Sequence, residues 1–176
     1  MIDEMKKRIF KNVLELGKLL LIVFIVSLFV RENVVASAYV PTGSMESTVM
    51  TGSRVLLHRL SYIWEDPQRG DIVVFYYPDN PKKIYLKRIM GLPGETIEGY
   101  NGVVYIDGMP LLKDFTAEKL EQDFGPFQVP EGCYFMMGDN RNDSWDSRYW
   151  NNKYVDKKKI LGKVSLEYYP EWKRLE

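Results

Sequence analysis

The chain has 176 residues, which is enough for one domain of ordinary size plus a short additional segment. Lysine and arginine number 24 and aspartate and glutamate also number 24, so the formal net charge is zero. A protein that binds nucleic acid needs a basic excess to pair with phosphates, and this composition argues against that class.

The first predicted element is a membrane-spanning helix over residues 13–30. The first 18 residues carry five basic and three acidic side chains, and the uncharged run LLLIVFIVSLFV follows at 19–30. At 1.5 Å per residue, a helix over the predicted span measures about 27 Å, close to the hydrocarbon thickness of a bilayer. Because basic flanks stay in the cytoplasm, we expect residues 1–12 on the cytoplasmic side and residues 31–176 outside.

A cleaved signal peptide is the alternative interpretation of this segment. Ala36-Ser37-Ala38 resembles a small-x-small cleavage site. However, Arg31 and Glu32 directly follow the apolar run, and five residues separate that run from Ala36. We therefore favour a permanent anchor and leave cleavage after Ala38 open.

Beyond the apolar run the sequence predicts a mainly antiparallel β domain. Short segments rich in β-branched and aromatic residues alternate with turn signals such as Asn101-Gly102. The predicted strands cover residues 54–60, 71–77, 83–90, 102–108 and 133–138. The one soluble helix that the pattern allows covers residues 114–124.

Several common catalytic and metal sites are excluded by residue type. His58 is the only histidine, and it lies inside a predicted strand with no serine or aspartate patterned around it. One cysteine, Cys133, and one histidine cannot complete a tetrahedral zinc site. We interpret both residues as structural, and the single cysteine also rules out an internal disulfide bond.

A lysine can replace histidine as a base if it is uncharged at neutral pH. Its ordinary pKa is about 10.4, and burial against apolar groups lowers that value. In the segment IYLKRIM, the two-residue period of a strand places Tyr85, Lys87 and Ile89 on one face. Lys87 is therefore the candidate base, and a lysine at a strand edge that reaches solvent is the alternative.

The candidate nucleophile lies in the segment YVPTGSMEST. Pro41 and Gly43 predict a turn that presents Ser44 with its backbone N–H available for an oxyanion hole. The hydroxyl of Thr42 could donate a second hydrogen bond there. The alternative is an ordinary polar loop.

Four segments together resemble the bacterial type I signal peptidases, in the single-anchor form typical of Gram-positive bacteria. They are PTGSM at 41–45, RGDIVVF at 69–75, YLKRIMGLPGE at 85–95 and GDNRNDSWDSR at 138–148. With the apolar N-terminal run, the resemblance covers nearly the whole chain. It implies an antiparallel coiled-sheet fold tethered by one transmembrane helix.

The resemblance also implies a role for individual residues. Ser44 would attack the scissile carbonyl, and neutral Lys87 would take its proton. The Ser44 N–H and the Thr42 hydroxyl would hold the oxyanion. Residues that would support the dyad are Ser144, Asp146 and Arg148, and those that would line shallow pockets for small side chains are Val40, Val49, Tyr85 and Leu86.

The implied substrates are secretory preproteins, cut after a small-x-small motif beside the lipid bilayer of the bacterial cell membrane. No metal or cofactor is implied. Two features depart from the family pattern. Ser47 stands where the family usually has proline, which predicts a looser turn, and the stretch 100–130 is short for the family's variable insertion.

Two other functions remain open at this point. The chain could be an anchored, non-catalytic β domain that binds a partner protein. It could also be another Ser-Lys protease, similar to the self-cleaving repressors, but the run at 19–30 and the absence of a helix-turn-helix pattern argue against this.

Overall fold

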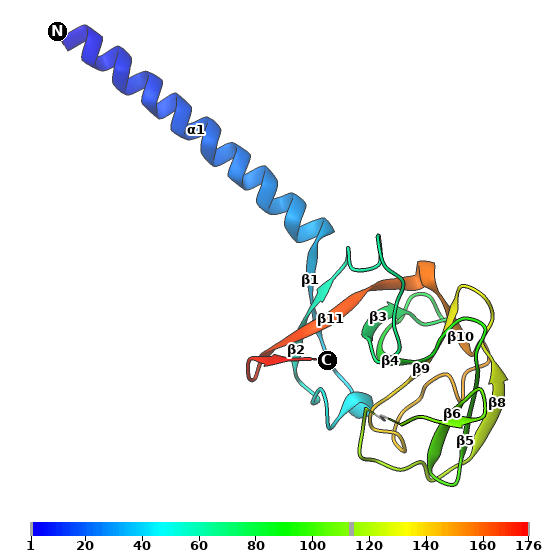
Figure 1. Cartoon of the computed structure of the whole chain (residues 1–176). Coiled ribbons are helices and arrows are strands. Elements are labelled where there is room, and N and C mark those ends of the chain that lie inside the picture. The colour runs from blue at the N-terminus through cyan, green and yellow to red at the C-terminus, as the bar shows by residue number, and fades with distance from the viewer. Residues whose placement is uncertain (1, 113–114, 176) are drawn as a thin grey trace. The chain divides into compact units, whose positions relative to one another are not determined.

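The chain divides into a helical unit, Met1–Ala36, and a β unit, Ser37–Glu176 (Figure 1). The computed structural model describes residues 2–112 and 115–175.

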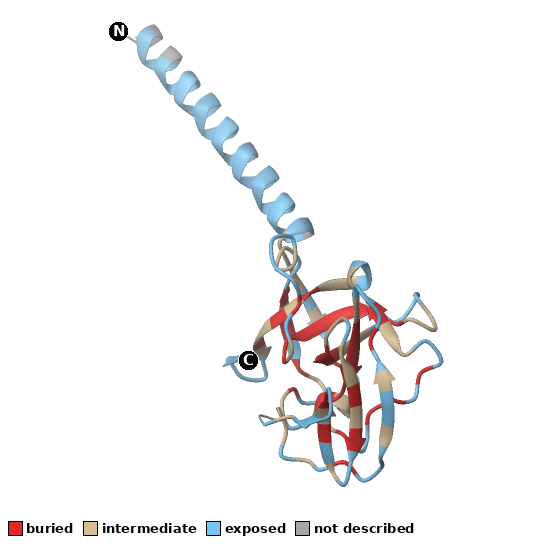
Figure 2. Cartoon of the chain, turned by 45° about the vertical axis from the view of Figure 1, so that its right-hand side comes forward, coloured by how far each residue is buried: buried red, intermediate tan, exposed pale blue. Residues whose placement is uncertain are grey.

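Helix α1 (Ile2–Asn33) makes up most of the first unit and is longer than the predicted span at both ends. The residues that precede the apolar run are largely Glu, Lys, Arg and Met, which are good helix formers, so they continue the helix. The two charged side chains near the basic end of the predicted span, Glu15 and Lys18, form an ion pair at 3.1 Å. The described residues of the helix are coloured as exposed along its length (Figure 2), and they include large apolar residues from Val13 to Val30.

The β unit contains one large curled sheet and one small sheet. Their neighbouring strands pair antiparallel wherever the register is defined. The large sheet has the order β1 (Val35–Tyr39), β2 (Arg54–His58), β11 (Ile160–Tyr169), β3 (Ile72–Tyr76), β4 (Ile84–Gly91), β9 (Cys133–Met137) and β10 (Tyr154–Asp156), and β12 (Lys173–Arg174) pairs with β11. The small sheet has the order β7 (Met109–Pro110), β6 (Val103–Ile106), β5 (Thr96–Tyr100) and β8 (Phe124–Gln128). Two short 3-10 helices, η1 (Gly43–Met45) and η2 (Lys157–Lys159), complete the described elements.

The prediction of a mainly antiparallel β domain is confirmed. All five predicted strands are present, as β2, β3, β4, β6 and β9, with ends that differ by a few residues. The stretch 100–130 supplies most of the small sheet, which joins the rest of the β unit instead of forming a second domain.

The predicted helix over residues 114–124 is wrong. Residues 115–123 contain no helix, Phe124 begins β8, and Asp114 lies outside the described residues. Tertiary contacts override a weak helical propensity here. Leu120 is buried in a core cluster, and the Glu118 carboxylate accepts a hydrogen bond from the backbone N–H of Arg141.

Strands β4 and β9 separate two apolar core clusters because their side chains alternate between the faces of the sheet. Tyr134 and Met136 of β9 pack into one cluster, with Val73, Phe75 and Trp150, and Ile89 of β4 belongs to it too. Phe135 and Met137 pack into the other cluster, with Met90 and Ile97. Tyr85 packs against the Ile89 cluster, so the predicted common face of Tyr85 and Ile89 is confirmed.

Candidate active site

Ser44 lies at the centre of the short helix η1, which is separated from β1 by three residues and directly follows an extended residue, Thr42. The backbone N–H of Glu46 donates to the Gly43 carbonyl at 2.9 Å and closes the turn. Met45 points inward and is fully buried, whereas Ser44 stays partly exposed. The predicted turn therefore presents the serine at the surface of the β unit.

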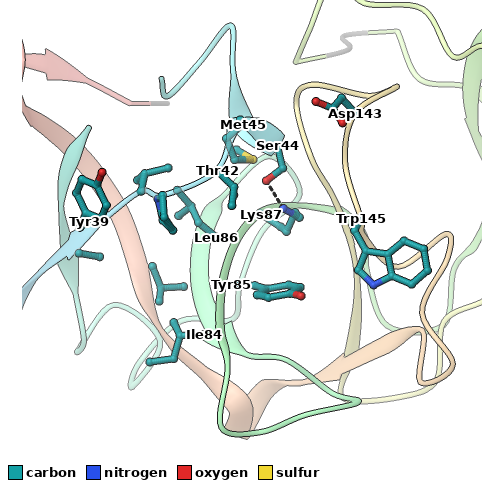
Figure 3. A pocket seen from close by; sticks show the side chains of 15 residues that line it. Tyr39, Thr42, Ser44, Met45, Ile84, Tyr85, Leu86, Lys87, Asp143 and Trp145 are labelled. Carbon is teal, nitrogen blue, oxygen red and sulfur yellow. Dashed lines mark hydrogen bonds between the residues drawn. The ribbon is translucent and has the colours of Figure 1, made fainter. Parts of the chain in front are cut away.

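Lys87 reaches this serine from the middle of β4. It pairs with Val73 of β3 in the ladder, and only 4% of its surface is exposed. Its Nζ donates a hydrogen bond to Ser44 Oγ (Figure 3), and the same Nζ lies 5.7 Å from the centre of the Tyr85 ring. The structure thus brings together the two residues expected to form a dyad.

Burial changes the acidity of this lysine. Desolvation lowers the pKa of Lys87 from 10.5 to about 8, and nearby Arg148 pushes it in the same direction. The carboxylates of Asp146 and Asp139 act against this shift, but they do not cancel it. A substantial fraction of Lys87 is therefore neutral near pH 8, and a neutral amine can accept the serine proton.

Asp146 and Arg148 form a buried ion pair in the loop that follows β9. The Arg148 guanidinium donates two hydrogen bonds to the Asp146 carboxylate, each at 2.8 Å. The other role of Asp146 is to accept the Gly138 N–H at 2.9 Å, and Arg148 also donates to the Arg141 carbonyl. This pair links the start of the loop, at Gly138 and Arg141, to its end at Arg148, and its predicted support of the dyad stays a prediction.

Ser144 is buried next to the dyad, but it forms no hydrogen bond with Lys87. Its Oγ has no hydrogen-bond partner in the described part of the chain. Gly138 separates it from the nucleophile turn, because a Cβ at this glycine would lie 2.2 Å from Ser144 Oγ and 2.3 Å from the Ser44 carbonyl oxygen. Only glycine allows the two turns to approach so closely.

Asn140 is a site residue to which the sequence analysis gave no role. Its side-chain amide donates to the Gly43 carbonyl at 3.0 Å, and its backbone N–H donates to the Ser44 carbonyl at 3.2 Å. Asn140 therefore connects the loop after β9 directly to η1. Its position next to Asp139 in a turn gave no indication of this partner.

The dyad opens into a cavity of about 390 Å³ with a largely apolar lining. Three of the four predicted pocket residues line it: Val40, Tyr85 and Leu86. Val49 does not, because the chain turns inward after η1 and buries this residue completely. The lining residues that the sequence did not indicate are Ala38, Tyr39, Met45, Val74, Ile84, Asp143 and Trp145.

The two residues interpreted as structural lie away from this cavity. His58 ends β2 with its side chain exposed, and it does not line the cavity around Ser44. Cys133 is half-buried in β9, where burial raises the pKa of its thiol. Both positions agree with the structural interpretation.

Thr42 lines the same cavity, and its hydroxyl does not cap the η1 turn. The Ser44 hydroxyl, the Lys87 amine with its lowered pKa and the Thr42 hydroxyl thus line the same apolar groove. These are the parts that acyl transfer by a serine needs when no histidine serves as base.

Comparisons with known proteins identify a peptidase family. A family model described as signal peptidase, peptidase S26, matches residues 13–169. A probable signal peptidase I-2 of Synechocystis sp. is 37% identical over 162 residues, which cover 89% of this chain and 73% of that protein. Signal peptidase I S of Bacillus subtilis is also 37% identical, over 172 residues and 91% of both chains.

A solved structure shows the same fold. The crystal structure of a signal peptidase I from Enterococcus faecalis matches with a TM-score of 0.51 and 37% identity, over 57% of this chain and 98% of that one. The extent of the family match and the identity to curated relatives lead to one conclusion: this chain belongs to the signal peptidase family, peptidase S26.

Proposed function

We propose that this signal peptidase is anchored in the membrane by α1 and cleaves secretory preproteins after a small-x-small motif, with Ser44 as nucleophile and Lys87 as base. The observation that carries the proposal is the contact between Lys87 Nζ and Ser44 Oγ inside an apolar surround.

The mechanism follows from this contact. Neutral Lys87 accepts the Ser44 proton as Oγ attacks the scissile carbonyl carbon, and the carbonyl oxygen becomes an oxyanion. The backbone N–H of Ser44 and the Thr42 hydroxyl are the donors proposed to hold it. The protonated lysine then gives its proton to the leaving amine as the C–N bond breaks, which leaves an acyl-enzyme and a neutral lysine. Lys87 next takes a proton from water as the water oxygen attacks the acyl carbon. It returns this proton to Ser44 Oγ as the ester C–O bond breaks, which releases the new carboxyl end and restores Ser44 and neutral Lys87.

The cavity offers two backbone edges to an extended peptide. One edge of β4 pairs with β3. On its other edge the defined pairing with β9 begins at Arg88, so residues Ile84–Lys87 have no partner in that register, and this edge borders the cavity. The segment Ala38–Val40 borders it from another side, at the end of the strand order. A peptide laid between these edges can add as a strand, and the aliphatic side chains of Val40, Val74 and Leu86 leave room for small residues.

The anchor is supported by the character of α1. A helix with apolar side chains exposed on all sides is stable only when protein or lipid covers it. The described helix is long enough to cross a bilayer, with an apolar candidate span of 28 residues, Glu4–Arg31. Pairing of Glu15 with Lys18 reduces the cost of placing these charges at the membrane boundary.

Cleavage of the chain after Ala38 is disfavoured by the position of this residue. Ser37 and Ala38 lie within β1, and the Ser37 hydroxyl is 2.6 Å from the Tyr168 hydroxyl. Ala38 itself lines the cavity beside the dyad. A cut at this point would divide β1 and remove part of the groove wall, so retention of α1 fits the function better.

The cleavage test uses the detergent-solubilised full chain and a synthetic preprotein with a small-x-small site. Wild type should release the signal peptide, and Ser44→Ala should lose cleavage entirely. Ser61→Ala, outside this cavity, is the matched control and should retain activity. Cleavage by Ser44→Ala, or none by wild type, would contradict the proposal. A non-catalytic binding module would instead keep its function in Ser44→Ala.

The topology is tested by cysteine labelling in a Cys133→Ala background. Lys11→Cys should react with a membrane-impermeant maleimide from the cytoplasmic side, and Lys158→Cys from the opposite side. Both positions are exposed in the structure. Labelling of both from one side would show that α1 does not span the membrane.

A further inference from the structure

The cavity continues beyond the dyad, past Lys87. Asp143 and Trp145 line this part, whereas Tyr39 and Ile84 line the opposite part, and Ser44 and Lys87 lie between them (Figure 3). The proposed mechanism uses neither Asp143 nor Trp145. Both side chains are exposed, and among the described residues they bring the only carboxylate and the only indole to the lining of this cavity.

Trp145 is exposed, yet its ring is held in place. Its side chain leaves 57% of the residue's surface in solvent. Tyr149 stacks on the indole with the ring centres 5.7 Å apart and the planes at 15°. The indole N–H donates to the Tyr77 hydroxyl at 3.3 Å, and that hydroxyl donates to Asp79 at 3.0 Å. An exposed indole fixed by a stacked ring and by a hydrogen bond at its edge is a preorganised surface.

The position of Trp145 decides which part of a substrate it meets. The aliphatic part of the groove, near Ile84 and Leu86, suits the small side chains before the scissile bond. A chain that passes Ser44 in an extended conformation must then continue toward Asp143 and Trp145. This inference rests on the proposed function, because it takes the scissile bond to lie at Ser44.

We propose that Asp143 and Trp145 form a subsite for the residues that follow the scissile bond, and that this subsite favours a basic side chain. A guanidinium or ammonium group is attracted to the face of an indole, and a neighbouring carboxylate adds a charge of the right sign. The same loop already uses this contact internally, since the Arg148 guanidinium lies 5.1 Å from the Tyr149 ring centre. Glutamate at the same substrate position would be repelled by Asp143.

The experiment measures kcat/KM for a set of peptides with one small-x-small site. Arginine, alanine or glutamate is placed in turn at the first, second and third positions after the scissile bond. With full-length wild type in detergent, arginine should exceed glutamate by about 5-fold at one of these positions. Trp145→Ala and Asp143→Asn should each bring this ratio toward one, while the alanine peptide is still cleaved. The ratio should also fall at high salt, because the charges are exposed.

Trp172→Ala is the matched control, since Trp172 is 77% exposed and does not line the cavity. It should leave the ratio unchanged. An equal loss for all peptides in Trp145→Ala, or a wild-type ratio near one at all three positions, would overturn the subsite but not the dyad. A ratio that stays unchanged in Trp145→Ala, with weaker binding to lipid vesicles, would assign this indole to the membrane instead. No cleavage of any peptide by wild type would overturn the proposed function and the subsite together.

Discussion

Asn140 donates a hydrogen bond from its side-chain amide to the carbonyl oxygen of Gly43, at 3.0 Å, and so joins the loop after β9 to the turn that carries Ser44. A second hydrogen bond, from the Asn140 backbone N–H to the Ser44 carbonyl, joins the same two segments. The nucleophile is therefore positioned by two segments almost one hundred residues apart in the chain.

Removal of the Asn140 side chain should lower kcat strongly and the free energy of unfolding only slightly. In Asn140→Ala the η1 turn keeps its own closing bond but loses one of its two ties to the loop, so Ser44 Oγ can move away from Lys87. We expect a decrease in kcat of about 10- to 100-fold in steady-state cleavage assays. Asn151→Ala is the control, because Asn151 is exposed and contributes its backbone N–H to Asp79. Full activity in Asn140→Ala would show that the loop does not position the serine.

Replacement of Lys87 by methionine should stabilise the fold at neutral pH. Because the folded-state pKa is about 8 and the ordinary value is 10.5, the unfolded chain binds more protons between these pH values. The free energy of unfolding of wild type therefore rises with pH across this window, and below it the burial of charge costs about 3 kcal/mol.

Thermal unfolding of wild type and Lys87→Met at several pH values tests this expectation. The midpoint of Lys87→Met should be higher at pH 7, and its advantage should shrink as the pH rises toward 10. If Lys87→Met has a lower midpoint than wild type at pH 7, and the difference does not change with pH, burial of the charged lysine does not destabilise the fold.

Ser47 has a positive φ of 82°, a backbone conformation that residues other than glycine rarely adopt. The resemblance to the family suggested that serine in place of proline only loosens this turn. The structure shows that proline would not fit at this position, because its φ is restricted to about −65° and it cannot take this conformation. We expect Ser47→Gly to raise the free energy of unfolding by about 1 kcal/mol and Ser47→Pro to lower it. Denaturant titration measures both, and a more stable Ser47→Pro would contradict the geometry of this turn.

Glu118 joins the irregular segment after β7 to the loop after β9. Its carboxylate accepts hydrogen bonds from the Arg141 N–H and from the Asn142 amide, the latter at 2.9 Å. Glu118→Ala should loosen the loop that carries Asp146 and lower kcat about 10-fold. It should also move the acid limb of the pH profile upward, because water would reach Lys87.

Glu121→Ala is the comparison for Glu118→Ala. Glu121 contacts the same loop through its backbone N–H, which donates to Asn142 at 3.0 Å. Its side chain can therefore be removed without breaking that bond. Equal kinetics and equal pH profiles of the two variants would leave Glu118 without a positioning role.

Much of the central sheet was predictable, because its signals are local. The strands β2, β3, β4 and β9 are runs of β-branched and aromatic residues between clear turns. The alternation in IYLKRIM correctly placed Tyr85 and Ile89 on one face. Strand β11 was missed although it is the longest, because Gly162, Lys163 and Ser165 interrupt its apolar pattern and the run of lysines at 157–159 resembles a loop.

The rest of the site depends on contacts between distant segments, which periodicity does not reveal. The resemblance to the family implied that Val49 lines the pocket, but the inward turn after η1 buries it. Trp145 directly follows Ser144 in sequence, and its place in the cavity depends on a hydrogen bond to Tyr77, 68 residues earlier. The segment 115–123 is shaped by its contacts with Asn142 and Arg141 and not by its own helical propensity.

The pH dependence of kcat/KM for wild type shows whether a partly neutral Lys87 activates Ser44. We expect activity to rise with pH through an apparent pKa of about 8, His58→Ala to have the same profile, and Lys87→Arg to be inactive at every pH because arginine keeps its proton. An acid limb near pH 6.5 that disappears in His58→Ala, or substantial cleavage by Lys87→Arg, would show that Lys87 is not the base.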